Sequence, residues 1–131
     1  MKRELKAICV VIKNEEKFFV AKDNDPDDFI NFWEFPGGHM ENIETMEEAA
    51  KRQIKKKLGI EIEEIEELCS STNDFGSFSM TVVACLCKAK SEPKLVTYDE
   101  GKFVTINELA KLKFTPAHYE VIGELIIRFA K

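Results

Sequence analysis

The chain has 131 residues, of which 44% are hydrophobic and 33% charged, and its formal net charge is −5. This length predicts one domain spanning residues 1–131, with enough chain for a real core. The acidic balance argues against a general nucleic-acid binder, and no apolar segment is long enough to cross a membrane. The opening residues lack a small-residue cleavage site, so we expect a cytoplasmic protein.

The first quarter of the chain predicts a hairpin followed by a loop. Leu5–Ile12 is rich in β-branched residues and predicts a central strand, and Asn14-Glu15 predicts the turn into a second strand at Lys17–Lys22. Residues 23–31 contain a proline and several aspartates without the spacing of a calcium loop. We therefore expect a solvated acidic loop after the hairpin.

The next segment predicts a strand, a glycine turn and a helix. Trp33–Phe35 is aromatic and strand-like, and it is followed by proline and two glycines at 36–38. Thr45 and Glu48 have the spacing of a capping box, and Gly59 suits a left-handed helix end. One helical face is marked by apolar residues at every fourth position, Met46, Ala50, Ile54 and Leu58. A carbonyl freed at the glycine turn can face a cation or a phosphate.

This segment resembles the Nudix box, a motif of spaced glycine, glutamate, arginine and aliphatic positions. Six positions agree in register: Gly38, Glu44, Arg52, Ile54, Gly59 and Ile60. The resemblance implies the Nudix fold and, within it, the MutT type of enzyme, which cleaves nucleoside triphosphates to monophosphate and pyrophosphate with Mg²⁺. It implies catalytic positions at Glu44, Arg52 and Gln53.

The chain departs from the family pattern at three positions where the family has glutamates that bind Mg²⁺ or Mn²⁺. Gln53, Lys56 and Lys57 stand there, which changes the local formal charge from −3 to +2. A divalent ion ~5 Å from one ammonium is repelled by roughly 6–7 kcal/mol at an effective dielectric of ~20. We therefore expect the usual metal cluster not to form.

The replaced positions predict a site for an anion. Helical geometry places Gln53, Lys56 and Lys57 along one edge of the buried stripe, where they could face a single ligand beside Gly37 and Gly38. The alternative is structural, because lysines in the last turn of a helix complement its macrodipole. A positive helix end does not exclude a phosphate, so both interpretations remain open.

Other polar residues are weaker candidates. Carboxylates that could rebuild a metal site lie at Glu41, Glu44, Glu47, Glu48, Asp99 and Glu100, and His39 lies beside them in the loop. By the MutT resemblance, His118 is the candidate for contacting a base, with Phe35 or Phe78 stacking on it. For these three residues the alternative is ordinary packing.

The second half of the chain predicts the rest of a mixed sheet and two helices. Strands are expected at Ile60–Leu68 and Phe78–Lys88 around a turn at 73–77, with shorter extended stretches at Leu95–Thr97 and Phe103–Thr105. Helices are expected at Ile106–Leu112 and from Thr115-Pro116 onward. The inward positions of the last helix are Val121, Leu125, Ile126 and Phe129. We expect the four cysteines, Cys9, Cys69, Cys85 and Cys87, to be small buried hydrophobes.

These elements predict an α/β sandwich, a mixed sheet between the box helix and the C-terminal helix. Three functions follow: a pyrophosphohydrolase with a rebuilt metal site, a module that binds a nucleotide or other pyrophosphate ligand without hydrolysing it, and an interaction domain that binds no small molecule. The second places Lys56 and Lys57 where the family has metal ions. No pattern in the sequence specifies an oligomeric state.

Overall fold

Strand β1 (Arg3–Asn14) lies at the centre of the sheet, as its run of β-branched residues predicts. The computed structural model describes residues 2–23 and 32–130. The other strands are β2 (Lys17–Lys22), β3 (Gly37–His39), β4 (Ile62–Asp74), β5 (Phe78–Ala89) and β6 (Glu100–Val104). The helices are α1 (Met46–Leu58), α2 (Ile106–Leu109) and α3 (Tyr119–Phe129), the last preceded by a 3₁₀ turn at Pro116–His118.

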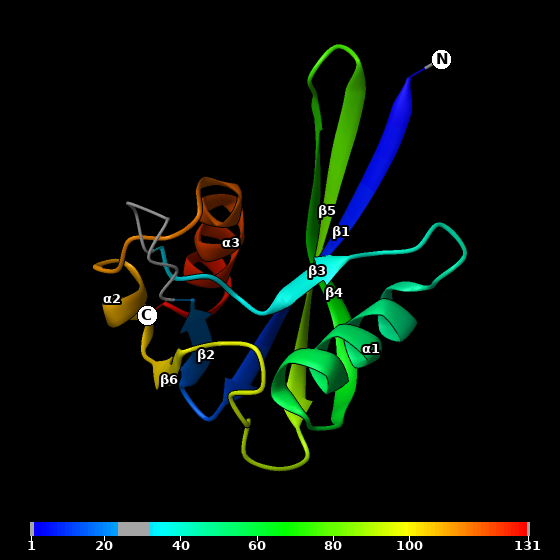
Figure 1. Cartoon of the computed structure of the whole chain (residues 1–131). Coiled ribbons are helices and arrows are strands. Elements are labelled where there is room, and N and C mark those ends of the chain that lie inside the picture. Colours follow the sequence, from blue (N-terminus) through cyan, green and yellow to red (C-terminus); the bar gives the residue numbers. More distant parts are fainter. Residues whose placement is uncertain (1, 24–31, 131) are drawn as a thin grey trace.

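The sheet is mixed, as expected. Its strand order is β4-β5-β1-β2-β6. The short strand β3 pairs with β1 at residues 7–9, whereas β2 pairs with β1 at Lys13 and Asn14. The central pair, β1 and β5, is parallel, and the remaining pairs are antiparallel. A long hairpin made by β4 and β5 projects away from the helices together with the start of β1 (Figure 1).

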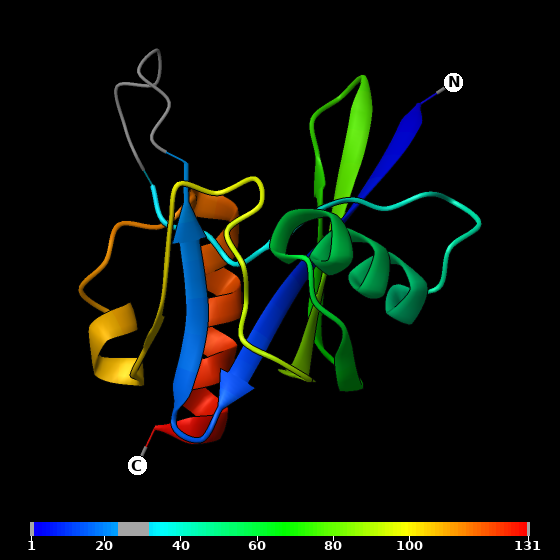
Figure 2. The ribbon, with the colours of Figure 1, turned by 60° about the horizontal axis from the view of Figure 1, so that its bottom comes forward.

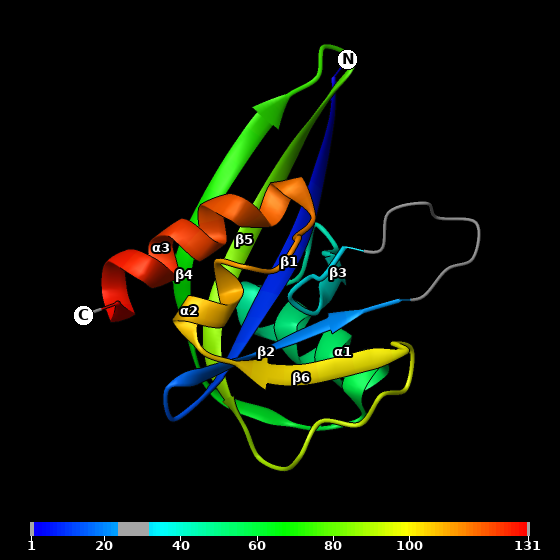
Figure 3. The same ribbon diagram turned by 90° about the vertical axis from the view of Figure 1, so that its left-hand side faces the viewer.

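The two faces of the sheet bury two separate apolar clusters. On β1 the side chains of Ile8, Val10 and Ile12 pack with Ala50 and Ile54 of α1. The alternate side chains of the same strand belong to the second cluster, with α3 residues that include Val121 and Leu125. The predicted sandwich is therefore confirmed, because the sheet separates α1 from α3 (Figures 2 and 3).

Helix α1 begins and ends as the sequence predicts. The Thr45 side chain accepts from the Glu48 backbone N–H, and the Glu48 carboxylate accepts from the Thr45 N–H, so the capping box is complete. Gly59 ends the helix with a φ of 64°, a left-handed conformation that glycine adopts without a steric penalty. The same device recurs at α2, where Thr105 and Glu108 form a second capping box.

The prediction of a strand at Trp33–Phe35 followed by a glycine turn is wrong. Trp33 and Glu34 make only isolated bridges, and the glycines themselves are part of strand β3. Gly37 lies so close to β1 that a Cβ added to it would stand 1.9 Å from the Ile8 carbonyl oxygen. The glycine therefore allows two backbones to approach, rather than allowing a turn.

Several predicted boundaries also differ. Strand β4 continues to Asp74, six residues beyond the expected end, because its polar second half pairs in regular register with β5. Leu95–Thr97 forms no strand. In α3 the buried positions are Val121, Ile122 and Leu125, whereas Ile126 is 38% exposed because the helix presents a narrower face than expected.

The cysteines are free thiols, and three of them are buried as expected, Cys9, Cys85 and Cys87. Cys69 is only partly buried. Of the predicted acidic loop at 23–31, only Asp23 falls within the described residues. Within those residues, no helix has the length and apolar character to span a membrane.

Replacing Gly37 with alanine is expected to destabilise the protein by about 3–5 kcal/mol, because the new methyl group collides with the β1 backbone. Gly123 in α3 provides the matched control, since a Cβ there would meet nothing within 4 Å. Gly123→Ala should stabilise by about 0.4–1 kcal/mol. Urea unfolding followed by circular dichroism measures both changes, and an unaltered midpoint for Gly37→Ala would contradict the close approach.

Candidate active site at the junction of β3 and α1

The candidate site lies where α1 packs against β3. Strand β3 pairs with β1 along one edge, through contacts such as Val10 N–H to the Pro36 carbonyl. The carbonyl oxygens of Gly37 and His39 instead accept hydrogen bonds from side chains of α1. These two carbonyls are the acceptors around which the site is arranged.

Gln53 fills the space above Gly38. Its Nε2 donates to the His39 carbonyl oxygen at 2.8 Å, and the residue is only 4% exposed. A Cβ on Gly38 would come within 2.9 Å of Gln53 Nε2, so the glycine leaves room for the amide. Among the described residues the Gln53 Oε1 atom is a buried side-chain acceptor without a hydrogen-bond partner.

Lys57 lies one helical turn further and reaches the other carbonyl. Its Nζ donates to the Gly37 carbonyl oxygen and stands 5.8 Å from the centre of the Tyr98 ring. The Tyr98 hydroxyl in turn donates to Glu34 Oε2 at 3.1 Å. Burial raises the pKa of Glu34, while the hydrogen bond from Tyr98 and the charge of Lys57 act in the opposite direction. Lys57 is thus an ammonium set among a carbonyl, a carboxyl and an aromatic ring.

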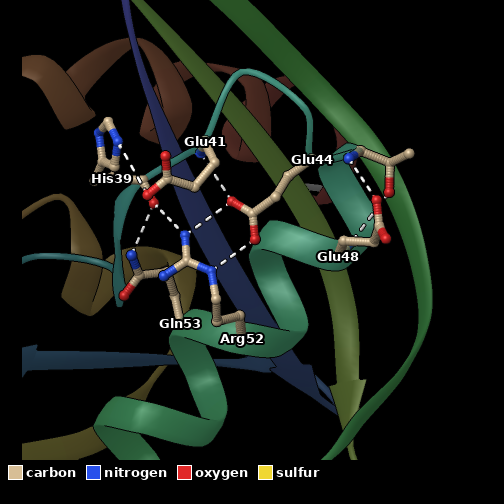
Figure 4. Close-up of polar contacts among 7 residues, drawn as sticks. His39, Glu41, Glu44, Glu48, Arg52 and Gln53 are labelled. Atoms are coloured by element: carbon tan, nitrogen blue, oxygen red, sulfur yellow. Dashed lines mark hydrogen bonds and ion pairs between the residues drawn. The ribbon is translucent and has the colours of Figure 1, made fainter.

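Arg52 and Glu44 form the best-defined ion pair of the site (Figure 4). Arg52 Nε donates to Glu44 Oε2 at 2.6 Å, and Arg52 Nη2 donates to Glu44 Oε1 at 2.8 Å and to the His39 carbonyl at 2.9 Å. Glu44 also accepts from the Glu41 backbone N–H. These hydrogen bonds, led by those from Arg52, lower the pKa of Glu44 to about 2. The pair holds the loop before α1 against the helix.

The structure does not bring the three replaced positions to one point. Gln53 and Lys57 both point at β3, whereas Lys56 is exposed on the next face of the helix. Glu48 is also separated from them, because its carboxylate caps the helix. Arg52 pairs with Glu44.

The candidate metal ligands are not assembled into a cluster. Glu44 is held by Arg52, Glu48 by the capping box and Glu100 by Lys22 at 3.3 Å. Glu41 lies in the exposed loop, 3.6 Å from His39. Across residues 2–23 and 32–130, no three histidine, cysteine, aspartate or glutamate side chains gather closely enough to hold a metal ion.

The residues present do not suit a divalent cation at the usual place in this fold. The Gly37 carbonyl already accepts from an ammonium, and the Gln53 Nε2 donates to the His39 carbonyl. One unpartnered amide oxygen is a poor substitute for carboxylates, since Mg²⁺ is normally held by one or two of them. The donor set therefore disagrees with the metal chemistry that the Nudix resemblance implies.

The three residues expected to contact a base are not arranged as one stack. His118 stacks on Phe35 with ring centres 5.7 Å apart, and its Nδ1 accepts from the Phe35 N–H. Phe35 is 1% exposed, so its ring is not available to a ligand. Phe78 lies at the tip of the β4–β5 hairpin, where it stacks on Phe75. Phe35 packs within the second apolar cluster.

Sequence reasoning missed Glu34 and Tyr98. Glu34 is partly buried, and Tyr98 is only 5% exposed. Glu34 lies within the aromatic stretch Trp33–Phe35, and Tyr98 directly precedes the candidate carboxylates at 99 and 100. Only the pairing of distant segments brings them together, and local periodicity carries no such signal.

A comparison with protein-family models matches the NUDIX domain over residues 2–125. The chain belongs to the NUDIX family. Members of this family generally use divalent metals. The matched span includes the sheet, the candidate site and most of α3.

Two curated relatives resemble part of the chain. An 8-oxo-dGTP diphosphatase of Proteus vulgaris is 30% identical over 76 residues, which is 58% of this chain and 68% of that protein. A nucleoside triphosphatase, NudI, of Enterobacter sp. strain 638 is 37% identical over 62 residues, 47% of this chain and 44% of that protein. The chain is thus a MutT-like member of the family.

Solved structures agree with the fold. A MutT protein, from work on Aliivibrio salmonicida and Vibrio cholerae, superimposes with a TM-score of 0.80 and 28% identity, covering 97% of this chain and all of that one. The ORF135 protein of E. coli gives a TM-score of 0.88 with 17% identity, covering 98% of this chain and 93% of that chain. The second comparison supports the fold alone.

Protein stability is expected to fall as the pH drops from about 6.5 to about 4. Burial lowers the pKa of His118 to about 4, so the unfolded chain binds a proton in this range that the folded chain excludes. The loss attributable to His118 approaches about 2–3 kcal/mol at the acid end. In His118→Asn the side-chain oxygen can replace the acceptor Nδ1 without titrating, and that variant should lose this component.

Urea unfolding at several pH values measures the difference between wild type and His118→Asn. His39→Asn is the matched control, because it removes an exposed histidine at the end of β3. Parallel pH profiles for the wild type and His118→Asn would contradict the assignment.

Proposed function

We propose that this chain binds a nucleotide or another pyrophosphate-containing ligand at the β3–α1 junction, and that its hydrolysis is lost or strongly impaired. The observation that carries the proposal is the position of Lys57, whose ammonium donates to the Gly37 carbonyl oxygen. A carbonyl directed at a cation is what the glycine-containing segment offers, and here the cation belongs to the protein itself.

The arrangement favours an anionic ligand. An ammonium has three N–H donors, and the Gly37 carbonyl accepts one of them, so others can be directed toward phosphate oxygens. Lys56 adds an exposed positive charge on the adjoining helical face. Charge-assisted hydrogen bonds from lysine to phosphate are among the stronger polar contacts in proteins. Ligand binding can therefore proceed without a bridging metal ion.

The same groups oppose hydrolysis. A Mg²⁺-dependent attack on phosphorus needs carboxylates that hold the ion and a group that positions water. The carboxylate of Glu44 is bound by Arg52, and that of Glu48 caps α1. Neither is free to replace the glutamates that are absent at 53, 56 and 57.

A working pyrophosphohydrolase is the alternative, favoured by the names of the relatives. It requires Glu41, Glu44 or Glu100 to leave their present contacts and converge on one ion. A ligand-free interaction domain is a further alternative, which the polar cluster at Lys57 does not favour. The binding proposal requires no rearrangement of side chains that are already paired.

Nucleotide binding is expected to be independent of Mg²⁺ and to depend on Lys57. Isothermal titration with nucleoside di- and triphosphates, with and without Mg²⁺, should give the same dissociation constant for the wild type. Lys56→Glu/Lys57→Glu should weaken binding by about tenfold or more, since two attractive charges become repulsive. Phosphate and pyrophosphate release should stay at background.

Lys51→Glu supplies the matched control, because it reverses an exposed charge on the same helix away from β3. If Lys51→Glu weakens binding as much as Lys56→Glu/Lys57→Glu, the effect reflects general electrostatics and not the site. Rapid Mg²⁺-dependent turnover by the wild type would overturn the proposal in favour of the hydrolase.

Gln53→Glu, Lys56→Glu and Lys57→Glu together are expected to create affinity for Mn²⁺, since they place carboxylates at 53 and 57 against the carbonyls of β3 and remove the positive charge at 56. Electron paramagnetic resonance of free Mn²⁺ measures the binding. The control protein carries Glu at 51, 55 and 56, which adds the same number of carboxylates to the same helix. Equal binding by the two proteins, or none by the restored one, would show that the site is misplaced.

A further inference from the structure

The two halves of edge strand β4 differ in character. The first half is rich in glutamate, departs from regular pairing with β5 at two bulges, and includes Glu64 with a φ of 53°. Charges and bulges of this kind are how natural proteins protect a sheet edge from pairing with another chain. The second half, Cys69–Asp74, has none of these features until its final aspartate.

The second half of β4 is a regular edge whose only charged residue is Asp74, which pairs with Lys2 at 2.6 Å. Its six residues pair without interruption, from Cys69 opposite Ala84 to Asp74 opposite Ser79. Figures 1 and 3 show this stretch on the outside of the projecting hairpin, and within the described residues its strand partner is β5 alone. Five serine, threonine, asparagine and cysteine side chains precede the aspartate.

The hydrogen-bond phase of the hairpin decides which backbone groups face outward. Phe75 N–H donates to the Phe78 carbonyl, so Phe75 and Phe78 form a hydrogen-bonded pair. Hydrogen-bonded and non-hydrogen-bonded pairs alternate along an antiparallel ladder. The N–H and C=O groups of Ser70, Thr72 and Asp74 therefore point away from β5. The next outward carbonyl, that of Leu68, is already taken by Arg128.

We propose that this edge is a homodimer interface, in which β4 pairs antiparallel with β4 of a second copy around a two-fold axis at Thr72. Thr72 then stands opposite Thr72 of the other copy, and Ser70 stands opposite Asp74. Every outward backbone group of these residues gains a partner in that register. The two sheets join into one continuous sheet.

The register is self-complementary in charge and in apolar surface. The glutamates of one copy lie beside the turn residues of the other, so no two carboxylates are directly opposed. Phe75, which is 59% exposed, comes opposite the partly buried Cys69 of the second copy on the face that carries α3. An exposed aromatic ring thus covers apolar surface at each end of the paired strands. A peptide from another protein would have no such reciprocal match.

Sedimentation equilibrium of the full chain over a range of concentrations tests the interface. The wild type should show a reversible monomer–dimer equilibrium. Thr72→Pro should make the protein monomeric, because it removes an outward N–H at the two-fold axis without removing a ladder bond to β5. Thr72→Val removes only the hydroxyl that contacts Thr81 and should leave the dimer in place.

Charge changes at Ser70 test the register itself. Ser70→Lys places an ammonium opposite Asp74 of the second copy, twice per dimer, and should tighten dimerisation about fivefold, whereas Ser70→Glu should weaken it similarly. Thr97→Lys and Thr97→Glu, in an exposed loop away from β4, control for the change in net charge. Circular dichroism verifies that each variant is folded.

A wild-type chain that stays monomeric at millimolar concentration would overturn the proposal. So would a dimer that Thr72→Pro leaves intact, or one that responds identically to lysine and glutamate at 70, because contact would then lie on another surface. The outcomes at Ser70 and Thr72 are independent of ligand binding, since both residues lie on β4, away from the β3–α1 junction.

Discussion

The docking of helix α1 onto strand β3 is the contact on which the rest of the site depends. Two backbone carbonyls of the short strand accept hydrogen bonds from three side chains of one helix, Arg52, Gln53 and Lys57. Carboxylates at 53 and 57 would bring acceptor against acceptor, and such an arrangement requires a cation between them. The Gln53 amide and the Lys57 ammonium donate directly to the carbonyls, so α1 packs against β3 without a cation between them.

Because these hydrogen bonds join α1 to β3 without a metal ion, membership of the family does not by itself assign an activity to this chain. The fold, the capped helix and the Arg52–Glu44 pair are features of a NUDIX domain that a change at three positions leaves in place. Of the residues at those three positions, Gln53 and Lys57 donate hydrogen bonds to the carbonyls of β3, and Lys56 is exposed. Scaffold and reaction are separable here because the scaffold residues face the apolar clusters or cap the helix.

Features encoded locally could be predicted from the sequence. The central strand, the capping box at Thr45, the left-handed end at Gly59 and the helix–sheet–helix layers all follow from short-range patterns. The conformation of the glycine segment could not be predicted. A side chain at 37 is excluded by the carbonyl of Ile8, and Ile8 is distant from Gly37 in the sequence. The cluster of Glu34, Lys57 and Tyr98 was missed for the same reason. The divergent directions of Lys56 and Lys57 depend on how the helix is seated against β3.

The contact between Lys57 and the Gly37 carbonyl also changes how the site relates to its surroundings. A bound metal ion dissociates when its concentration in solution falls or when a chelator competes for it. The Lys57 side chain is covalently part of the protein, so a chelator cannot remove it. The positive charge that Lys57 places at this junction is therefore set by the amino-acid sequence and does not depend on the concentration of a metal ion.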